Sequence, residues 1–396
     1  MNEEELADFF TQYLKRFVTT DKDKMVNALV KASILERRAD NLRFKYRYLF
    51  YFFASMNLAD TLHRDNAAKE TISGLIDTIH LEKSSNVVLF LSHHSKDPWI
   101  LDEILYSIID IFPEEHEATL ETESLRFLKD FVDSIPEIVI ESRDPHQERR
   151  KQDARRDIAE RQQEETLIDE EETNLETEEK ASALVKKIEK VFRATEVCGQ
   201  ILRNRIGSLE RESLELLYDE SITVLLKLLN IVLETSRCLQ EEGLRSIKQA
   251  LRQAPDATDE EITKRARTFY MELNYALIFA ILQKISFSLG SDSGKEIYDS
   301  VAQDKKTAAV NLVQTVMELQ FEKRLDHRAI AKLYQQFISS KNLVCARLLK
   351  MIVVYHCYMH DISYKDRQMI SDTFRIELYP LKVMESRKQQ RKKSTQ

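Results

Sequence analysis

The sequence predicts an all-α protein, an irregular helical array of the α-solenoid kind. Two observations favour this fold class. The 396 residues include only six glycines and six prolines, the two residue types that most often end helices and shape turns. Apolar residues also recur at the 3.6-residue spacing of a helix along most of the chain. We therefore expect long helices packed in successive antiparallel pairs and joined by short polar corners.

The first 46 residues predict two helices followed by a hairpin. Apolar side chains lie at helical spacing from Leu6 to Phe17, and a second helical pattern follows Asp21. Residues 34–46, ILERRADNLRFKY, then place turn residues between two short runs. Because helices followed by a hairpin outline a winged-helix subdomain, residues 1–46 are assigned to a winged-helix-like remnant.

A helical subdomain is expected over residues 47–140. Its predicted helices after the first aromatic one cover residues 64–80, 86–93, 98–111 and 117–134. Residues 86–105, NVVLFLSHHSKDPWILDEIL, contain two adjacent histidines between apolar runs. Here Asp97 can cap a helix and Pro98 can take its first position. This pattern indicates a corner between two packed helices.

Two blocks of opposite charge predict a boundary near the middle of the chain. Arg143–Arg161 carries seven basic residues, and Glu164–Glu179 carries nine acidic residues and no basic one. Such blocks are typical of solvated linkers or protruding charged helices. Residues 141–180 are therefore assigned to a charged linker or protruding helix.

Residues 181–384 predict a C-terminal helical domain. The expected helices cover residues 181–205, 210–234, 258–289, 305–324, 327–339 and 342–360. Gly207 is expected to end the first of them in the left-handed conformation. Thr258 and Glu261 predict a capping box at the start of the third. The basic tail, residues 385–396, is expected to be disordered.

Composition argues against several classes of protein. The net charge of −8 and the pI near 5.8 are unlike those of dedicated nucleic-acid binders, which are usually basic. Four distant cysteines without a CxxC pair favour buried thiols in a reducing cytoplasm. The acidic start MNEEELADFF is unlike a signal peptide, and the most apolar stretch, residues 48–59, is too short to span a bilayer. We expect a cytoplasmic protein that does not enter a membrane.

Two histidine pairs are candidates for chemistry. His93 and His94 are consecutive, so on a helix they point about 100° apart and cannot face one ion. A serine nucleophile beside them would need a base oriented by a third group. His356 and His360 share a helix face, but the residues between them lack the glutamate of a zinc hydrolase. A structural role is favoured for all four.

A glycine-rich loop is the remaining candidate for a cofactor site. Residues 290–296, GSDSGKE, have three residues between the glycines and Glu296 after the lysine, and they follow a helical pattern. A phosphate-binding loop needs four residues, a hydroxyl after the lysine and a preceding strand. We interpret the segment as a polar loop. The sequence therefore predicts no catalytic, cofactor-binding or metal-ligating residue and no cofactor.

An aromatic run near residue 50 is interpreted as one packed helix face. Its members are Phe44, Tyr46, Tyr48, Tyr51 and Phe52. Basic residues between the aromatics could contact a nucleic-acid backbone, although the acidic chain as a whole argues against this. These are Arg43, Lys45 and Arg47.

Four segments carry a family resemblance. Residues 42–59 are LRFKYRYLFYFFASMNLA, residues 86–105 contain FLSHHSKDPWILDEIL, residues 193–209 are RATEVCGQILRNRIGSL, and residues 354–370 are VYHCYMHDISYKDRQMI. Together, and in this order, they resemble the C-terminal part of bacterial STAND-type NTPases, the NACHT-related signalling ATPases often found in anti-phage systems.

The resemblance implies a winged-helix remnant followed by a helical sensor or effector-coupling region. The Walker A, Walker B and sensor residues of those ATPases have no counterpart here, so no catalytic residue is carried over. We expect a non-catalytic regulatory or sensor protein that binds a protein partner, such as a STAND-type ATPase or an effector in trans, or else a degenerate remnant.

Two alternatives remain open. One is a nucleic-acid-binding protein that uses the winged-helix remnant and the basic tail. The other is a metal-dependent enzyme that uses His93, His94, His356 or His360.

Overall fold

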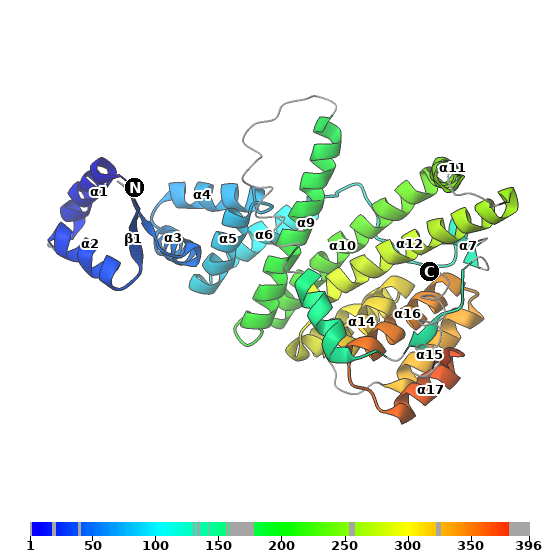
Figure 1. Cartoon of the computed structure of the whole chain (residues 1–396). Coiled ribbons are helices and arrows are strands. Elements are labelled where there is room, and N and C mark those ends of the chain that lie inside the picture. The colour runs from blue at the N-terminus through cyan, green and yellow to red at the C-terminus, as the bar shows by residue number, and fades with distance from the viewer. Residues whose placement is uncertain are drawn as a thin grey trace. The chain divides into compact units, whose positions relative to one another are not determined.

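The computed structural model describes residues 2–17, 21–38, 41–129, 131–132, 135–141, 143–155, 158, 178–252, 258–321 and 326–379. Almost every element is a helix, which confirms the predicted all-α class (Figure 1). Strands in these ranges form only two small two-stranded sheets. The chain divides into two compact units, Met1–Ile108 with Glu189–Val197 and Ile109–Ile188 with Cys198–Gln396.

Unit 1 holds the N-terminal helices and one hairpin. Its elements are α1 (Glu3–Arg16), α2 (Lys22–Lys31), β1 (Leu35–Arg38), β2 (Asn41–Phe44), α3 (Arg47–Thr61), α4 (Asn66–Asp77), α5 (Glu82–His94) and α6 (Pro98–Ile109). The strands pair antiparallel from Leu35 opposite Phe44 to Arg38 opposite Asn41. The predicted hairpin is therefore present, and its expected turn at Ala39 and Asp40 lies outside the described residues.

Polar caps fix where the first helices begin. The Asn2 side chain accepts a hydrogen bond from the Glu5 N–H at 2.8 Å, and the Glu5 carboxylate accepts one from the Asn2 N–H. This reciprocal pair is a capping box. Asp21 caps α2 by accepting hydrogen bonds from the backbone of its first turn.

The stretch around the two histidines is a helix corner, as predicted. The Asp97 carboxylate accepts a hydrogen bond from the Trp99 N–H at 3.0 Å, and α6 begins at Pro98. The Ser95 hydroxyl in turn accepts from the Asp97 N–H. Capping by aspartate and proline thus reverses the chain between α5 and α6.

Unit 2 contains the longer helices and a short parallel strand pair. Its elements are α7 (Arg126–Lys129), β3 (Val139–Glu141), α10 (Arg211–Cys238), α11 (Gln240–Leu251), α12 (Asp259–Leu289), η2 (Asp292–Gly294), α13 (Lys295–Lys305), α14 (Ala308–Phe321), α15 (His327–Ser339), α16 (Leu343–Met359), α17 (Tyr364–Phe374) and β4 (Glu377–Tyr379). The helix α9 (Glu178–Arg205) contributes residues to both units.

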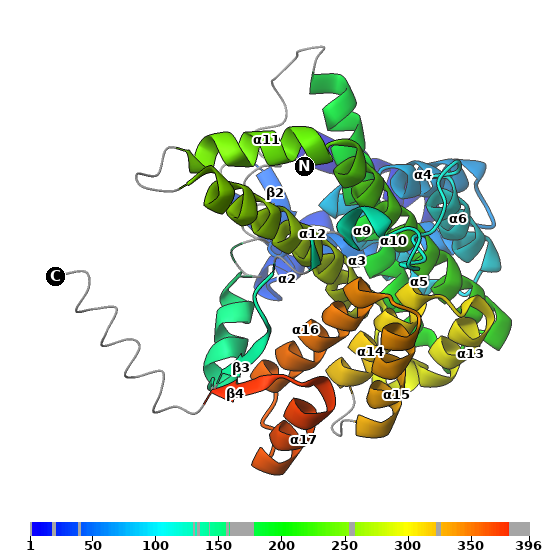
Figure 2. The same ribbon diagram turned by 90° about the vertical axis from the view of Figure 1, so that its right-hand side faces the viewer.

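The core of unit 2 is built helix against helix. The helix α10 packs along α12 and α13, and α11 lies along α12 (Figure 2). The helix α16 packs against α12, α14 and α15. Its buried side chains occur on most of its surface rather than on one stripe, which is the pattern of a helix enclosed by others.

The predicted helix over residues 117–134 is wrong. Among the described residues of this range, only Arg126–Lys129 is α-helical, and Leu120 has a left-handed backbone with φ of 54° although its side chain is fully buried. The preceding residues hydrogen-bond to other elements instead of to one another. The Ala118 N–H donates to the Leu226 carbonyl of α10 at 3.0 Å.

The same segment accepts hydrogen bonds from buried donors at the start of two other helices. The Thr119 carbonyl accepts from the Ala309 N–H of α14 at 2.9 Å. The Leu120 carbonyl accepts from the Asn342 side chain, which caps α16, at 2.7 Å. Apolar spacing cannot distinguish such a buried segment from a helix, because both alternate apolar and polar side chains.

Helix ends differ from the prediction at two places. No glycine has positive φ, so the expected left-handed Gly207 is wrong; the Ser208 and Leu209 N–H groups both bond to the Arg205 carbonyl. The helix predicted from residue 305 begins later, at Ala308 of α14, because the preceding helix α13 ends at Lys305 and is followed by a left-handed Lys306. The capping box of Thr258 and Glu261 is confirmed.

The charged blocks are only partly described. Residues 145–155 of the basic block are helical. Most of the acidic block, residues 164–177, and the basic tail, residues 385–396, lie outside the described residues. Over the described ranges, no single helix is long and apolar enough to cross a membrane. The segments Asp259–Leu289 and Asp292–Lys305, which meet at a sharp bend, are long and apolar enough when they are taken together.

A close approach between α9 and α12 requires a glycine within residues 193–209. A Cβ on Gly199 of α9 would lie 1.7 Å from the backbone oxygen of Ser288, near the end of α12. One turn later, Arg203 donates hydrogen bonds to the carbonyls of Ser288 at 2.9 Å and Gly290 at 3.2 Å. A cation at a helix C-terminus is favourable because those carbonyls have no partner within the helix.

We predict that Gly199→Ala destabilises the protein by about 3 kcal/mol or more, because overpacking against rigid backbone forces α9 and α12 apart. Urea unfolding followed by circular dichroism measures this loss. The matched control is Gly74→Ala in α4, where no atom lies within 4 Å of the added Cβ. Removing that helical glycine should leave stability unchanged or raise it by up to about 1 kcal/mol. Equal effects of the two changes would contradict the close approach.

Candidate partner-binding site

At the corner, the His94 ring and the Asp97 carboxylate have different partners. The His94 ring packs edge-on against Phe52, with ring centroids 4.7 Å apart. Asp97 instead meets His63, with Nε2 3.4 Å from its carboxylate. Because Asp97 also caps α6, this group has a structural task at the corner.

The glycine-rich segment lies between helices, as predicted. It follows α12 rather than a strand, and it forms η2 before α13. A Cβ on Gly294 would collide with the Tyr298 side chain, whose hydroxyl donates to the Leu289 carbonyl at 2.8 Å. A packed tyrosine therefore occupies the place where a phosphate-binding loop would have its cradle.

His356 and His360 share one face of α16, with ring centroids 4.3 Å apart. The buried His356 ring donates from Nδ1 to the Leu319 carbonyl at 2.8 Å in its neutral form. Burial, together with the smaller effect of the neighbouring His360, lowers the pKa of His356 to about 4. Across the described ranges, no group of three or more His, Cys, Asp or Glu side chains could hold a metal ion.

The depressed pKa of His356 predicts sensitivity to acid. Its folded-state pKa lies below the ordinary value of 6.5, so the unfolded chain binds the proton more tightly. Stability is then lost as the pH falls below 6.5, and by about pH 5 the loss reaches about 2 kcal/mol. Urea unfolding at pH 8 and pH 5 measures it. His356→Gln should remove this part of the loss, whereas His116→Gln, an exposed control, should not.

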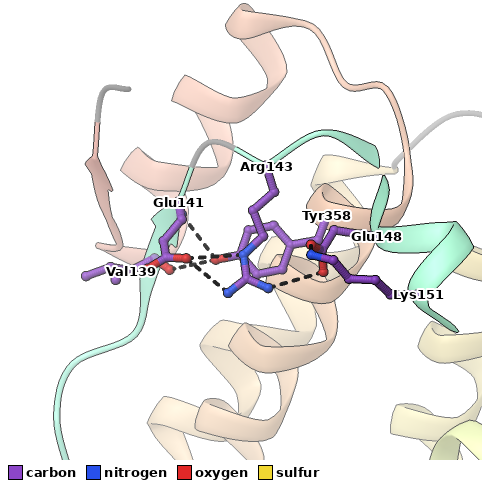
Figure 3. Close-up of polar contacts among 6 residues, drawn as sticks. All are labelled: Val139, Glu141, Arg143, Glu148, Lys151 and Tyr358. Carbon is purple, nitrogen blue, oxygen red and sulfur yellow. Dashed lines mark hydrogen bonds and ion pairs between the residues drawn. The ribbon is translucent and has the colours of Figure 1, made fainter. Parts of the chain in front are cut away.

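A polar cluster joins the start of the basic block to α16 (Figure 3). The Arg143 guanidinium pairs with Glu141 at 3.0 Å and with Glu148 at 3.3 Å. It lies 4.3 Å from the centre of the Tyr358 ring. Arginine suits this position because its planar group can pair with carboxylates while it stacks on an aromatic face.

The Tyr358 hydroxyl holds strand β3 at the same place. It donates to the Val139 carbonyl at 3.2 Å and accepts from the Glu141 N–H at 3.1 Å. Strand β3 pairs in parallel with β4, near the end of the described chain (Figure 2). Burial raises the pKa of Tyr358, so the hydroxyl keeps its proton for donation.

We predict that Arg143→Met loosens this cluster without unfolding unit 2. Hydrogen exchange should become faster in the amides of residues 139–141 and 146–155, because both carboxylates lose their shared cation. Mass spectrometry of peptic fragments measures the rates. Arg150→Met is the control, since this exposed arginine lies in the same basic block. Unchanged exchange in the first variant would contradict a role for the cluster in holding the segment.

An exposed apolar surface of unit 1 lies on α1 and just after it. Phe9, Tyr13 and Phe17 form a ladder of stacked rings, with centroids 5.9 Å and 4.8 Å apart. Phe9 is 50% exposed, Phe17 is 56% exposed and Leu14 beside them is 46% exposed. We call these four residues the α1 ladder.

The aromatic run near residue 50 is only partly packed. Tyr51 is buried and Phe44 stacks on Phe53, as predicted. Tyr46 and Tyr48 were expected to pack as well, but they stack on each other and stay about half exposed. Tyr46 precedes α3 and Tyr48 lies in its first turn, where the neighbouring elements do not cover them. The prediction that these two rings are packed is therefore wrong.

The basic residues of the same run already have partners inside the unit. Arg43 pairs with Glu36 across the hairpin. Lys45 donates to the Ser33 hydroxyl at 3.2 Å, and Arg47 lies 3.9 Å from Glu82. The charges of Arg43 and Arg47 are matched by nearby acids, and positive charge of this kind attracts a phosphate backbone less strongly.

Sequence reasoning did not single out the α1 ladder as a surface. It identified Phe9, Tyr13, Leu14 and Phe17 as the apolar stripe of a helix, which describes a buried and an exposed face equally well. The spacing of i, i+4 and i+8 for the three rings is the signal that was available.

The α1 ladder lies in the part of the chain that matches a known family. The model of the family described as Novel STAND NTPase 4 matches residues 1–54, which include α1, α2, the hairpin and the first half of α3. This match supports a STAND-related origin. No curated protein and no solved structure matches the chain.

Proposed function

We propose that this chain is a non-catalytic helical regulatory protein that binds a protein partner through the α1 ladder. The partner is a nucleotide-binding module of the STAND type, or an effector that acts with one, in a bacterial defence system. The chain would relay partner binding through its helices in the cytoplasm. Its four cysteines are free thiols, which is compatible with a reducing compartment.

The exposed ladder on the family-related segment is the observation that carries this proposal. Stacked aromatic rings that stay in water are unfavourable, and exposed apolar patches of this kind commonly mark interaction sites. Aromatic side chains also supply much of the binding free energy at protein interfaces. A STAND-type module is the occupant that the family match at residues 1–54 favours.

Substitution of the ladder should abolish partner capture. Phe9→Asp combined with Phe17→Asp places charge where the apolar contact would form, while Phe10, the buried face of α1, stays intact. Tagged protein is purified from its native host with and without phage infection, and bound proteins are identified by mass spectrometry. We expect a STAND-type NTPase or its effector with the unaltered chain and at least a tenfold loss with the variant.

Phe269→Asp is the matched control, because Phe269 is 55% exposed on α12 of unit 2. It should retain the partner. Recovery of no STAND-type or effector protein under either condition would contradict the proposal. Equal loss with the ladder variant and the control would contradict the role of α1.

A further inference from the structure

Unit 2 contains a cavity of about 370 Å³ that no part of the proposed function uses. Its walls come from α15, α16, the end of α17 and residues 135–138. The volume falls in the range typical of pockets for small ligands or single peptide residues. Residues 135–138 lead directly into strand β3, which the Tyr358 hydroxyl holds.

Three cations from two helices line this cavity. Arg347 and Lys350 lie one turn apart on α16, and Arg375 follows α17. Glu137 is the one acidic residue among the lining side chains. The cavity is therefore cationic in a chain whose net charge is −8. None of the three cations forms an ion pair within the described part of the chain.

The guanidinium of Arg347 has an N–H group that lacks an acceptor within the described part of the chain. Its Nη2 donates to the Pro136 carbonyl at 2.7 Å, and its Nε is buried without an acceptor among the described residues. Burial lowers the pKa of Arg347, yet a guanidinium remains charged at neutral pH. A buried donor without an acceptor is unfavourable, and more so on a charged group.

Aromatic rings lie near two of these cations. Arg347 lies 5.6 Å from the Tyr275 ring centre, and Lys350 lies 5.5 Å from that of Tyr334. Rings stabilise a cation without neutralising its charge. The positive potential inside the cavity therefore remains available to an anion, and its strength is greater there than in bulk water.

The rest of the wall is apolar. Ile135 and Ile138 lie on one side, and Ile338 and Leu343, 39% and 40% exposed, lie on the other. Such walls favour a ligand with an apolar body beside its negative charge. The carboxylate of Glu137 opposes a second negative charge on the ligand and can accept a hydrogen bond from an amide N–H.

We propose that this cavity binds a carboxylate attached to an apolar peptide residue, as at the C-terminus of a protein chain. Arg347 and Lys350 would hold the carboxylate, the isoleucines would cover the side chain, and Glu137 would accept a peptide N–H. Arginine is suited to this task because its planar fork matches the two oxygens of a carboxylate. The site lies within unit 2 and is independent of the α1 ladder.

Binding of a defined probe tests the assignment. Fluorescein-labelled Ala-Ala-Leu with a free carboxylate is titrated with the full chain, and anisotropy is followed at low and high salt. We expect saturable binding that weakens as salt rises, and no binding of the amidated peptide. Lys350→Gln and Arg347→Gln should each weaken binding about tenfold or more, the size expected for one charged hydrogen bond.

Controls separate this site from general charge effects. Lys332→Gln removes an exposed cation of α15 that does not line the cavity, and it should leave binding unchanged. Arg375→Asn should weaken binding and still fold, because residue 375 has φ of 52° and asparagine tolerates that conformation. Urea unfolding verifies that each variant is folded.

Competition identifies the source of the carboxylate. Weaker displacement by N-acetyl-leucinate than by the unlabelled peptide supports a protein terminus. Equal displacement by these two compounds would contradict a peptide terminus as the ligand and would indicate a small carboxylic acid. Equal binding of the amidated peptide, equal weakening by Lys332→Gln, or stronger displacement by inorganic phosphate overturns the proposal. Phe9→Asp with Phe17→Asp should bind the probe normally, so failure here is distinct from failure of partner capture.

Discussion

The fold of unit 2 depends on an ion cluster around Lys305. Its Nζ lies 2.8 Å from the Glu117 carboxylate and 2.9 Å from that of Asp219, and it donates to the Thr223 hydroxyl at 2.9 Å. Burial by itself lowers the pKa of Lys305, but the hydrogen bonds to the two carboxylates raise it more, so the net shift is upward. The lysine therefore stays charged, and removing it would leave two partly buried acids without their cation.

This cluster fixes the segment that replaces the predicted helix after residue 116. With Glu117 anchored, the next residues reach helix ends far along the chain. The Glu121 carboxylate accepts from the Ala308 N–H at 2.9 Å, beside the bonds that Thr119 and Leu120 make. Unpaired donors at helix starts are thereby satisfied inside the core, where they would otherwise be unfavourable. An irregular segment thus aligns α10, α14 and α16, and α16 carries both the Arg143 cluster and two cations of the cavity.

The two units carry different kinds of surface, and each is suited to a different ligand. Unit 1 presents aromatic rings on a helix that belongs to the STAND-related segment. In unit 2, cationic side chains line a cavity, and part of the cavity wall leads into β3.

The sequence by itself determined the helical class, most helix ranges and several caps, because these depend on local spacing and local hydrogen bonds. Asp97 with Pro98 and Thr258 with Glu261 are examples. Only the tertiary structure decided what satisfied the backbone of residues 117–121, because those partners lie more than a hundred residues away. It likewise decided that the α1 ladder is exposed and that Arg375 lines the same cavity as Arg347 and Lys350 of α16. Periodicity shows that a helix has an apolar face, but the neighbours that cover that face are set by packing.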